Sequence, residues 1–412
     1  MAWRGVFVAT GLWAAGASAF AAEPPAVCLL DQDRAAKTWP YDADDPNRNE
    51  KGVRFDLAGA CAELTAGVSY TYQHARKSTS GLPVIVNRNG TLSDGSSSNT
   101  VSAYLGLETS RDTTLGEFKT TVSASWSKAT GDGSPNGTFS VSGWSVGLGG
   151  LTVGYTGTLM SFWESEFLST ATAPGRSANT IVYEYAFDDA NTIAAGLESN
   201  LPTTPEAVTG LKNFDFSDPV YTLRWRYDSE ALRFHLSGLA RRADFSASPL
   251  LPLFPDTATV RTGWAASIGL AVPTPFTGES DEIRFQATYA VDASSYLGIS
   301  NDLTTYQHTV RSRGPTTGWS AVGSFRHVWS EQFESNIFAS YLTLRADLLL
   351  AKPQAQTFRT GVNLYWKPRD KVKLGVELGT VDNRLEPNGI VGIFSGSSGR
   401  ALVGYLSMAV DL

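Results

Sequence analysis

The chain has 412 residues, of which 42% are hydrophobic and only 18% are charged. Soluble proteins usually carry charge on about a quarter of their residues, so this composition argues against a set of ordinary soluble domains. The formal net charge is −7 and the sequence has no basic stripe, which excludes nucleic acid as an expected partner.

The first 21 residues have the order of a secretory signal peptide. Arg4 gives a positive start, residues 6–17 are mostly apolar, and small residues follow up to Ala21. We expect cleavage after Ala21. The apolar stretch is shorter than the roughly 20 residues that a membrane-spanning helix needs, so a retained anchor is the weaker alternative.

Two cysteines, Cys28 and Cys61, follow the signal. In an oxidising compartment an isolated pair is most simply one disulfide, and no histidine lies near either cysteine to complete a zinc site. We expect residues 22–61 to form a periplasmic segment tied down by this disulfide. Residues 42–47 offer carboxylate ligands but lack the spacing of a calcium loop. A solvated acidic stretch is the preferred reading, and no metal site is expected.

From residue 62 to the end, apolar and polar residues alternate, which is the signature of strands with two different faces. Most of these segments are longer than the five or six residues typical of soluble sheets, and a tilted strand needs about 9–11 residues to cross a membrane. The clearest segments lie at 64–73, 221–227, 260–272, 283–291, 358–366 and 402–412.

The connections between the expected strands are alternately short and long. Short ones are expected near residues 113–115, 149–150, 188–191, 228–230, 273–280, 330–332 and 367–370. Long ones are expected near 78–98, 129–137, 159–178, 200–217, 244–257, 293–315, 347–354 and 386–397. Short turns on one side and long loops on the other are typical of outer-membrane barrels. The sequence therefore predicts an all-β fold, a transmembrane antiparallel β-barrel of about 16 strands over residues 62–412.

A soluble β-sandwich is the alternative for any single strand, and the positions of the aromatic residues argue against it. They fall near strand ends on the apolar face, as in the aromatic girdle at a membrane interface. In a β-sandwich the large core side chains would instead lie in the middle of the strands. These residues are Tyr70, Tyr72, Trp225, Tyr227, Trp319, Trp329 and Trp366.

Several segments resemble the porin family typical of alpha-class proteobacteria. Residues 61–70 look like the first strand of that family, and residues 107–118 are similar to its first periplasmic turn. Residues 263–278 with 287–297, and residues 361–368 with 374–377, resemble two later hairpins. The resemblance implies a homotrimeric barrel of sixteen strands whose third loop folds inward and narrows the pore.

With this resemblance, the third long loop, residues 158–178, becomes the expected pore constriction. Its candidate constriction residues are Trp163, Glu164, Glu166 and Arg176, with Phe162 and Phe167 pinning the loop to the wall. An ordinary external loop with solvated carboxylates is the alternative.

The polar positions of the strands carry many cations, which we expect to line the pore because arginine facing lipid at the midplane would cost about 2–4 kcal/mol. Opposite acidic loop residues they would set up a transverse field, with a weak lean to cation selectivity. The expected pore-lining residues are Arg224, Arg226, Arg233, His235, Arg241, Arg261, Arg284, Arg326, Arg359, Lys371 and Lys373.

The sequence thus predicts a channel for passive diffusion of small hydrophilic solutes and ions, set in outer-membrane lipid. A substrate-specific channel for a sugar or an organic acid is the main alternative, with Tyr365 and Phe338 as candidate stacking residues. A surface adhesin or phage receptor is a third. No catalytic motif is present, since Ser69 and His74 have no orienting partner, and neither an enzyme nor a cofactor is expected.

Overall fold

Exposure alternates along the strands as the sequence predicts. In the computed structural model, Thr222 and Arg224 of β11 (Val220–Asp228) are buried, whereas Leu223 and Trp225 are exposed. Each strand therefore has an apolar outer face and a largely polar inner face. The structure describes residues 53–57, 59–77, 85–87, 90–91, 97–130, 137–163, 167, 173–175, 177–199, 216, 218–245, 259–278, 280–298, 314–347, 352–386 and 397–411.

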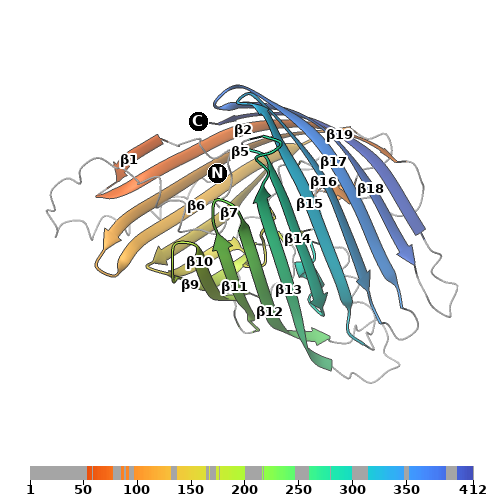
Figure 1. Ribbon diagram of the computed structural model, residues 1–412, viewed down its shortest axis with the longest axis horizontal. Helices are drawn as coiled ribbons and strands as arrows, with labels where there is room; N and C mark the ends of the chain where they lie inside the picture. The colour runs from red at the N-terminus through yellow and green to blue at the C-terminus, as the bar shows by residue number, and fades with distance from the viewer. Residues whose placement is uncertain are drawn as a thin grey trace, which may run out of the picture.

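Sixteen strands of these described residues form one closed antiparallel barrel. Each strand pairs with its neighbours along the chain, and the last strand pairs with the first barrel strand to close the ring (Figure 1). Closure pairs the backbone along both sides of every strand, which a structure inside lipid requires. The strands are β2 (Ala60–Lys77), β5 (Ser97–Thr113), β6 (Gly116–Ala129), β7 (Thr138–Leu148), β8 (Leu151–Gly157), β9 (Ser177–Ala186), β10 (Asn191–Glu198), β11, β12 (Arg233–Phe245), β13 (Thr259–Pro273), β14 (Glu282–Val291), β15 (Thr317–Ser330), β16 (Phe333–Arg345), β17 (Gln354–Arg369), β18 (Val372–Glu386) and β19 (Ser397–Asp411).

The alternation of short and long connections is confirmed. Seven short turns link the strand pairs from β5–β6 to β17–β18, and the longer connections join the opposite ends. A small hairpin of β3 (Ile85–Asn87) and β4 (Gly90–Thr91) lies within the first long connection. The 3-10 helix η1 (Ser294–Tyr296) follows β14. No helix of the described residues is long and apolar enough to cross a membrane.

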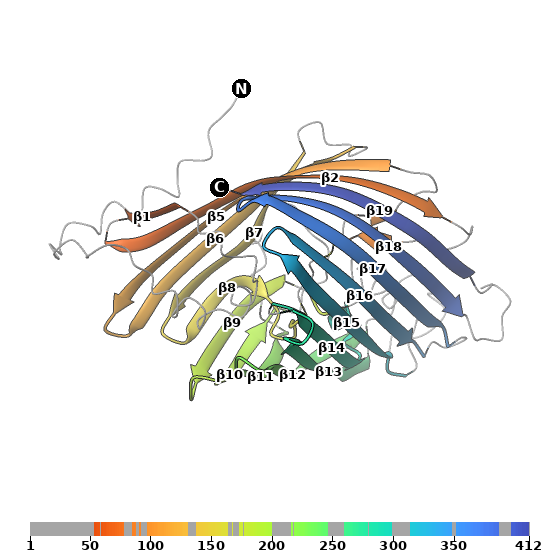
Figure 2. The same cartoon turned by 45° about the horizontal axis from the view of Figure 1, so that its top comes forward.

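An additional strand, β1 (Val53–Leu57), precedes the barrel and was not expected from the sequence. It pairs with β2 from Leu64 to Ala60, whereas β19 pairs with β2 only from Gly67 onward. β1 thus continues along the edge of β2 where β19 ends, close to the C-terminus (Figure 2). Cys61 lies in β2 and is not a free thiol. Cys28 and the signal sequence lie outside the described residues, so the pairing of the two cysteines stays a prediction.

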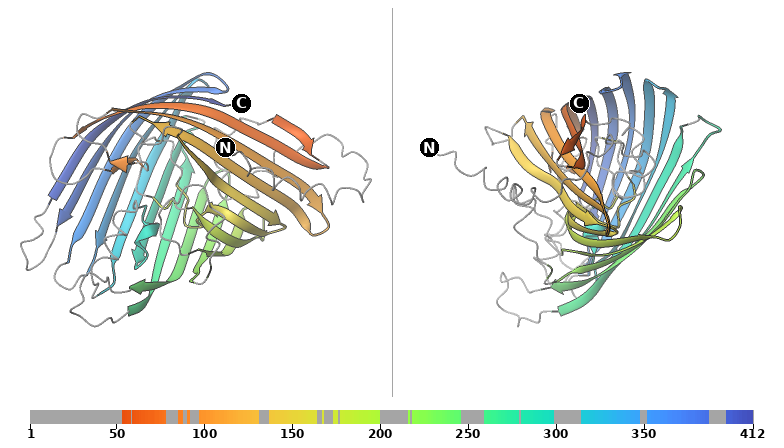
Figure 3. Two further views of the ribbon diagram at one scale, coloured as in Figure 1. Left: turned by 180° about the vertical axis from the view of Figure 1, so that it is seen from behind. Right: turned by 90° about the vertical axis from the view of Figure 1, so that its left-hand side faces the viewer.

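Aromatic residues on the outer face lie near the strand ends, as predicted. Trp225, Trp319 and Trp366 are each about 40% exposed, and Trp329 is 65% exposed. Several of them touch a neighbouring ring: the Trp319 and Tyr341 centroids are 5.0 Å apart. The strands curve round a common interior (Figure 3). In lipid this outer face is the one that meets the acyl chains.

A charge in the middle of the outer face should destabilise the barrel. Ile337 lies midway along β16 and is 54% exposed. Ile337→Arg should lower the free energy of unfolding in lipid vesicles by about 2–4 kcal/mol, measured by urea titration. Ser102→Arg, on the inner face of β5, is the control and should cost much less. Equal losses in the two variants would contradict the assignment of inner and outer faces.

The short turn between β13 and β14 is held by one buried carboxylate, Asp281. Its Oδ1 accepts a 2.8 Å hydrogen bond from the Val328 N–H, and its Oδ2 lies 2.5 Å from Nδ1 of His327. Burial works to raise the pKa of Asp281, but the hydrogen bonds from Thr277, Val328 and His327 outweigh it and hold the pKa below its ordinary value.

Because this pKa is lower in the folded state, the stabilisation by Asp281 is fully present above the ordinary pKa of aspartate, about 4, and is lost as pH falls through the folded value. Asp281→Asn should therefore be less stable than wild type at neutral pH and should lose less stability on acidification. Urea unfolding at neutral and acidic pH measures both effects. Parallel pH profiles for the two proteins would contradict this role.

Candidate functional site: the inner wall and the third loop

The inner face of β5–β8 is rich in hydroxyl groups. They pair across strands: Thr121 Oγ1 and Ser145 Oγ are 2.6 Å apart. The charges on this stretch include the ion pair of Lys119 with Glu108, at 2.6 Å. This part of the wall therefore offers neutral donors and acceptors to anything inside the barrel.

The inner face of β9–β14 carries arginines that are paired with carboxylates of the wall itself. Arg224 forms an ion pair with Glu184 on β9. Arg233 and Arg284 both bind Glu282, the latter at 2.7 Å. Arginine–carboxylate pairs of this kind are charge-assisted and strong when shielded from water, so these side chains are held in place along the wall.

Most of the other predicted basic residues also have partners on the wall. Arg226 lies 2.5 Å from Asp228, and Arg261 lies 3.0 Å from Asp292. Lys373 lies 3.3 Å from Glu334. Arg326 donates to the backbone oxygen of Ser280 at 3.0 Å, His235 is buried beside Ser237, Arg241 is half-buried and Arg359 is buried.

Lys371 is an exception among the predicted pore-lining residues. It lies in the exposed turn between β17 and β18 rather than on the inner face of a strand. Lys371 lies two residues before Lys373, so the two-residue alternation would place both side chains on the inner face. The strand, however, begins only at Val372. The turn therefore removes Lys371 from the wall.

The carboxylates that pair with the arginines were missed by the sequence reasoning. Arginines were expected to face acidic residues of the third loop, yet Glu184, Glu282 and Asp292 supply the opposite charge from the wall and its rim. Glu184 and Glu282 also lie at inward positions of their strands, so the alternation that picked out the arginines could have found them.

The beginning of the third loop lies against the inner wall, where Gln286 of β14 holds it. The Gln286 Oε1 accepts hydrogen bonds from the Trp163 and Phe162 N–H groups at 2.7 and 3.3 Å. Its Nε2 donates to the Met160 oxygen at 2.7 Å and to Ser267 Oγ at 2.9 Å. One buried amide thus satisfies three backbone groups of the loop, more than a hundred positions away in the sequence.

Aromatic packing extends this contact over β13–β16. Trp163 Nε1 donates to Ser324 Oγ at 2.9 Å. The Phe167 ring meets Phe338 edge-on at 4.4 Å between centroids. Phe162 packs so closely on Gly269 that a Cβ there would lie 2.2 Å from its ring. These contacts require glycine at position 269 and give the predicted Trp163 a place on the inner wall.

A buried carboxylate fixes the start of the loop. Glu198, at the end of β10, is fully buried and its Oε1 accepts hydrogen bonds from Thr158 Oγ1 and the Leu159 N–H, at 2.8 and 3.1 Å. Its Oε2 accepts from the Tyr296 hydroxyl at 3.0 Å. Glu198 therefore joins the third loop to the segment after β14. Glu164, Glu166 and Arg176 lie outside the described residues.

The two candidate stacking aromatics are not free. Phe338 faces inward, but it is 2% exposed and is covered by Trp163 and Phe167. Tyr365 is 5% exposed, with the Lys373 ammonium 4.0 Å from its ring centre. Neither ring offers an open face for a sugar.

Several solved structures share this fold. The outer membrane channel DcaP of Acinetobacter baumannii has a TM-score of 0.66 at 15% identity, over 88% of this chain and 100% of that one. OprB of Pseudomonas putida has a TM-score of 0.53 at 10% identity, over 85% and 94%. The trimer form of OmpT of Vibrio cholerae has a TM-score of 0.51 at 10% identity, over 86% and 99%.

The sequence itself matches the family described as "Porin subfamily" across residues 63–385, which is most of the chain. This chain belongs to that porin family. No curated protein matches it. The porin is a channel of the bacterial outer membrane.

Detaching the third loop from Gln286 should change conduction. Gln286→Leu keeps the size of the side chain but leaves buried backbone groups of the loop without partners, at about 1–3 kcal/mol each. We expect larger and noisier single-channel conductance in planar bilayers. Gln356→Leu, on the outer register of β17, is the control. Unchanged conductance in a folded Gln286→Leu porin would show that the loop does not depend on this amide.

Proposed function

We propose that this porin lets small hydrophilic solutes and ions diffuse passively, and that the loop of residues 158–178 narrows its pore. The observation that carries this proposal is the set of hydrogen bonds from Gln286, because they tie the loop to the wall across from the strands it connects. Hydroxyl groups and paired charges on the wall favour hydrated solutes and give apolar ones little to bind.

In this proposal the constriction is formed by Trp163, Glu164, Glu166 and Arg176 on the loop and by arginines of the inner wall. The wall arginines are largely compensated by Glu184, Glu282 and their counterparts. Any additional carboxylate on the loop then tips the local balance towards cations, since selectivity follows the field at the narrowing.

A substrate-specific channel for a sugar or an organic acid is the second candidate. Sugar recognition of this kind would need a row of accessible aromatic faces along the pore. Phe338 lies beneath the loop, and the Lys373 ammonium covers the ring of Tyr365. The inner wall therefore favours diffusion over specific binding of a sugar.

We further propose that the porin is a homotrimer and belongs with the porins of alpha-class proteobacteria. The trimer form of the OmpT structure, which shares the fold, supports the first point. The resemblance of residues 61–70 and 361–377 to that group supports the second. Membership of a channel family supports a role without catalysis.

Removing carboxylates from the pore should shift ion selectivity towards anions. Glu184→Gln takes away the carboxylate beside Arg224, and Glu164→Gln with Glu166→Gln takes two from the loop. Both should move the reversal potential under a salt gradient in the anion direction. Glu230→Gln, in the exposed turn between β11 and β12, makes the same kind of charge change outside the pore and should leave it unchanged. If the reversal potential stayed the same in the first two variants, these carboxylates would not determine the ion selectivity of the pore.

The proposed solute class is tested by the swelling of liposomes that contain the purified porin. Uncharged sugars of increasing size should enter at rates that fall smoothly with size, without saturation. Saturable entry of one sugar or organic acid, or block of conductance by it, would instead support the substrate-specific channel. No entry of any solute would contradict both.

A further inference from the structure

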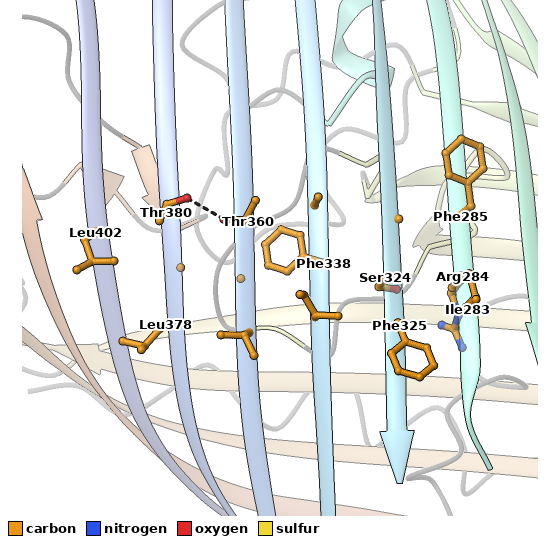
Figure 4. A pocket seen from close by; sticks show the side chains of 16 residues that line it. Ile283, Arg284, Phe285, Ser324, Phe325, Phe338, Thr360, Leu378, Thr380 and Leu402 are labelled. Carbon is orange, nitrogen blue, oxygen red and sulfur yellow. Dashed lines mark hydrogen bonds between the residues drawn. The ribbon is translucent and has the colours of Figure 1, made fainter. Parts of the chain in front are cut away.

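A groove of about 630 Å³ crosses the outer, lipid-facing side of β14–β19 (Figure 4). Its floor is a lateral row of small side chains that are paired in register, strand by strand: Gly323, Ala339, Thr360 and Thr380. Phe285 pairs with Gly323 at one end of the row, and Leu402 pairs with Thr380 at the other. The large side chains of Phe285 and Leu402 therefore bound the two ends of a strip in which the small side chains leave space.

The groove is apolar along its whole length. The next row in register towards the periplasmic turns is formed by Ile283, Phe325, Ile337, Val362 and Leu378. The hydroxyl groups of Thr360 and Thr380 hydrogen-bond to each other at 2.8 Å, so they need no partner from a ligand. The volume is within the range of about 300–1,000 Å³ typical of small-molecule sites.

Arginines lie on the same outer register beyond one end of the groove. Arg400 is two positions from Leu402, and Arg384 is four positions from Thr380. At about 3.3 Å per residue these are roughly 7 and 13 Å along the strands. Their side chains are 64% and 59% exposed. The arginines thus lie at a distance from the apolar floor at which a lipid headgroup would sit when its acyl chain lies in the groove.

This end of the outer face has a net positive charge. Asp382 lies between the two arginines, 2.7 Å from Arg400 and 3.5 Å from Arg384, and is itself only 19% exposed. The remaining charged residues of this register on β2, β16 and β18 are Arg76, Arg345 and Glu386. Four guanidinium groups against two carboxylates leave an excess of donors suited to phosphate oxygens.

We propose that this outer face binds an anionic phospholipid, one acyl chain lying in the groove and the negatively charged headgroup held by Arg384 and Arg400. Charge complementarity selects the lipid over a second copy of the chain: a copy that met this end through the same face would bring its own net positive charge against it, whereas an anionic headgroup balances the excess. Small side chains in the floor let a flexible acyl chain approach the sheet backbone. Each arginine near an anionic headgroup strengthens binding about fivefold.

The test is native mass spectrometry of the purified, delipidated porin in detergent with added phosphatidylglycerol or phosphatidylcholine. The groove is filled by Gly323→Leu with Ala339→Leu; a Cβ on Gly323 meets only ordinary contacts at 3.8 Å or more, so this variant should fold. Ala240→Leu with Ala266→Leu, at exposed outer positions of β12 and β13, is the matched control. Arg384→Gln with Arg400→Gln is compared with Arg242→Gln, which is also exposed on the outer face.

Wild type should retain phosphatidylglycerol in preference to phosphatidylcholine. The groove-filled variant should lose both lipids, and the double arginine variant should lose about thirtyfold in affinity for phosphatidylglycerol only. Equal lipid retention by the groove-filled variant and its alanine control would overturn the proposal. It would also be overturned if filling the groove changed the oligomeric state instead, which would indicate a second copy, or if inorganic phosphate alone displaced the lipid.

Discussion

Everything in this structure depends on the need to pair backbone polar groups inside lipid. A strand has N–H and C=O groups on both edges, and leaving them unpaired in hydrocarbon costs several kcal/mol per group. Pairing β19 with β2 removes the last open edges of the ring. Once the ring is closed, each strand must turn one face to lipid and one to the interior, and the two-residue alternation follows from that.

The interior that closure creates is lined by compensated charge, beside apolar clusters such as the one around Met160 and Tyr296. Arg224 and Arg233 each reach across one intervening strand to a carboxylate, Glu184 of β9 and Glu282 of β14, and these charge-assisted pairs hold the guanidinium groups against the wall. The third loop uses this polar interior as its docking surface, through Gln286 and Glu198. The same wall therefore both faces the solute path and holds the loop that we propose narrows it.

The sequence predicts the architecture better than the contacts inside it. Alternation alone assigned Arg284 and Arg359 to the inner face, and turn residues gave the order of short and long connections. Partners such as Glu184 for Arg224 are forty positions apart, and Gln286 meets a loop more than a hundred positions away. Such pairs depend on barrel stagger, which a single sequence does not encode locally. β1 is too short to produce a clear alternation.

Single-channel conductance of the purified mature porin in a planar bilayer tests the central claim most directly: that the closed barrel has an open, water-filled interior. Wild type should insert as discrete, ohmic steps, and the steps of a trimer should close in threes. A heat-modifiable, folded barrel that never conducts would contradict this account, because its polar interior would then be blocked rather than open to solutes.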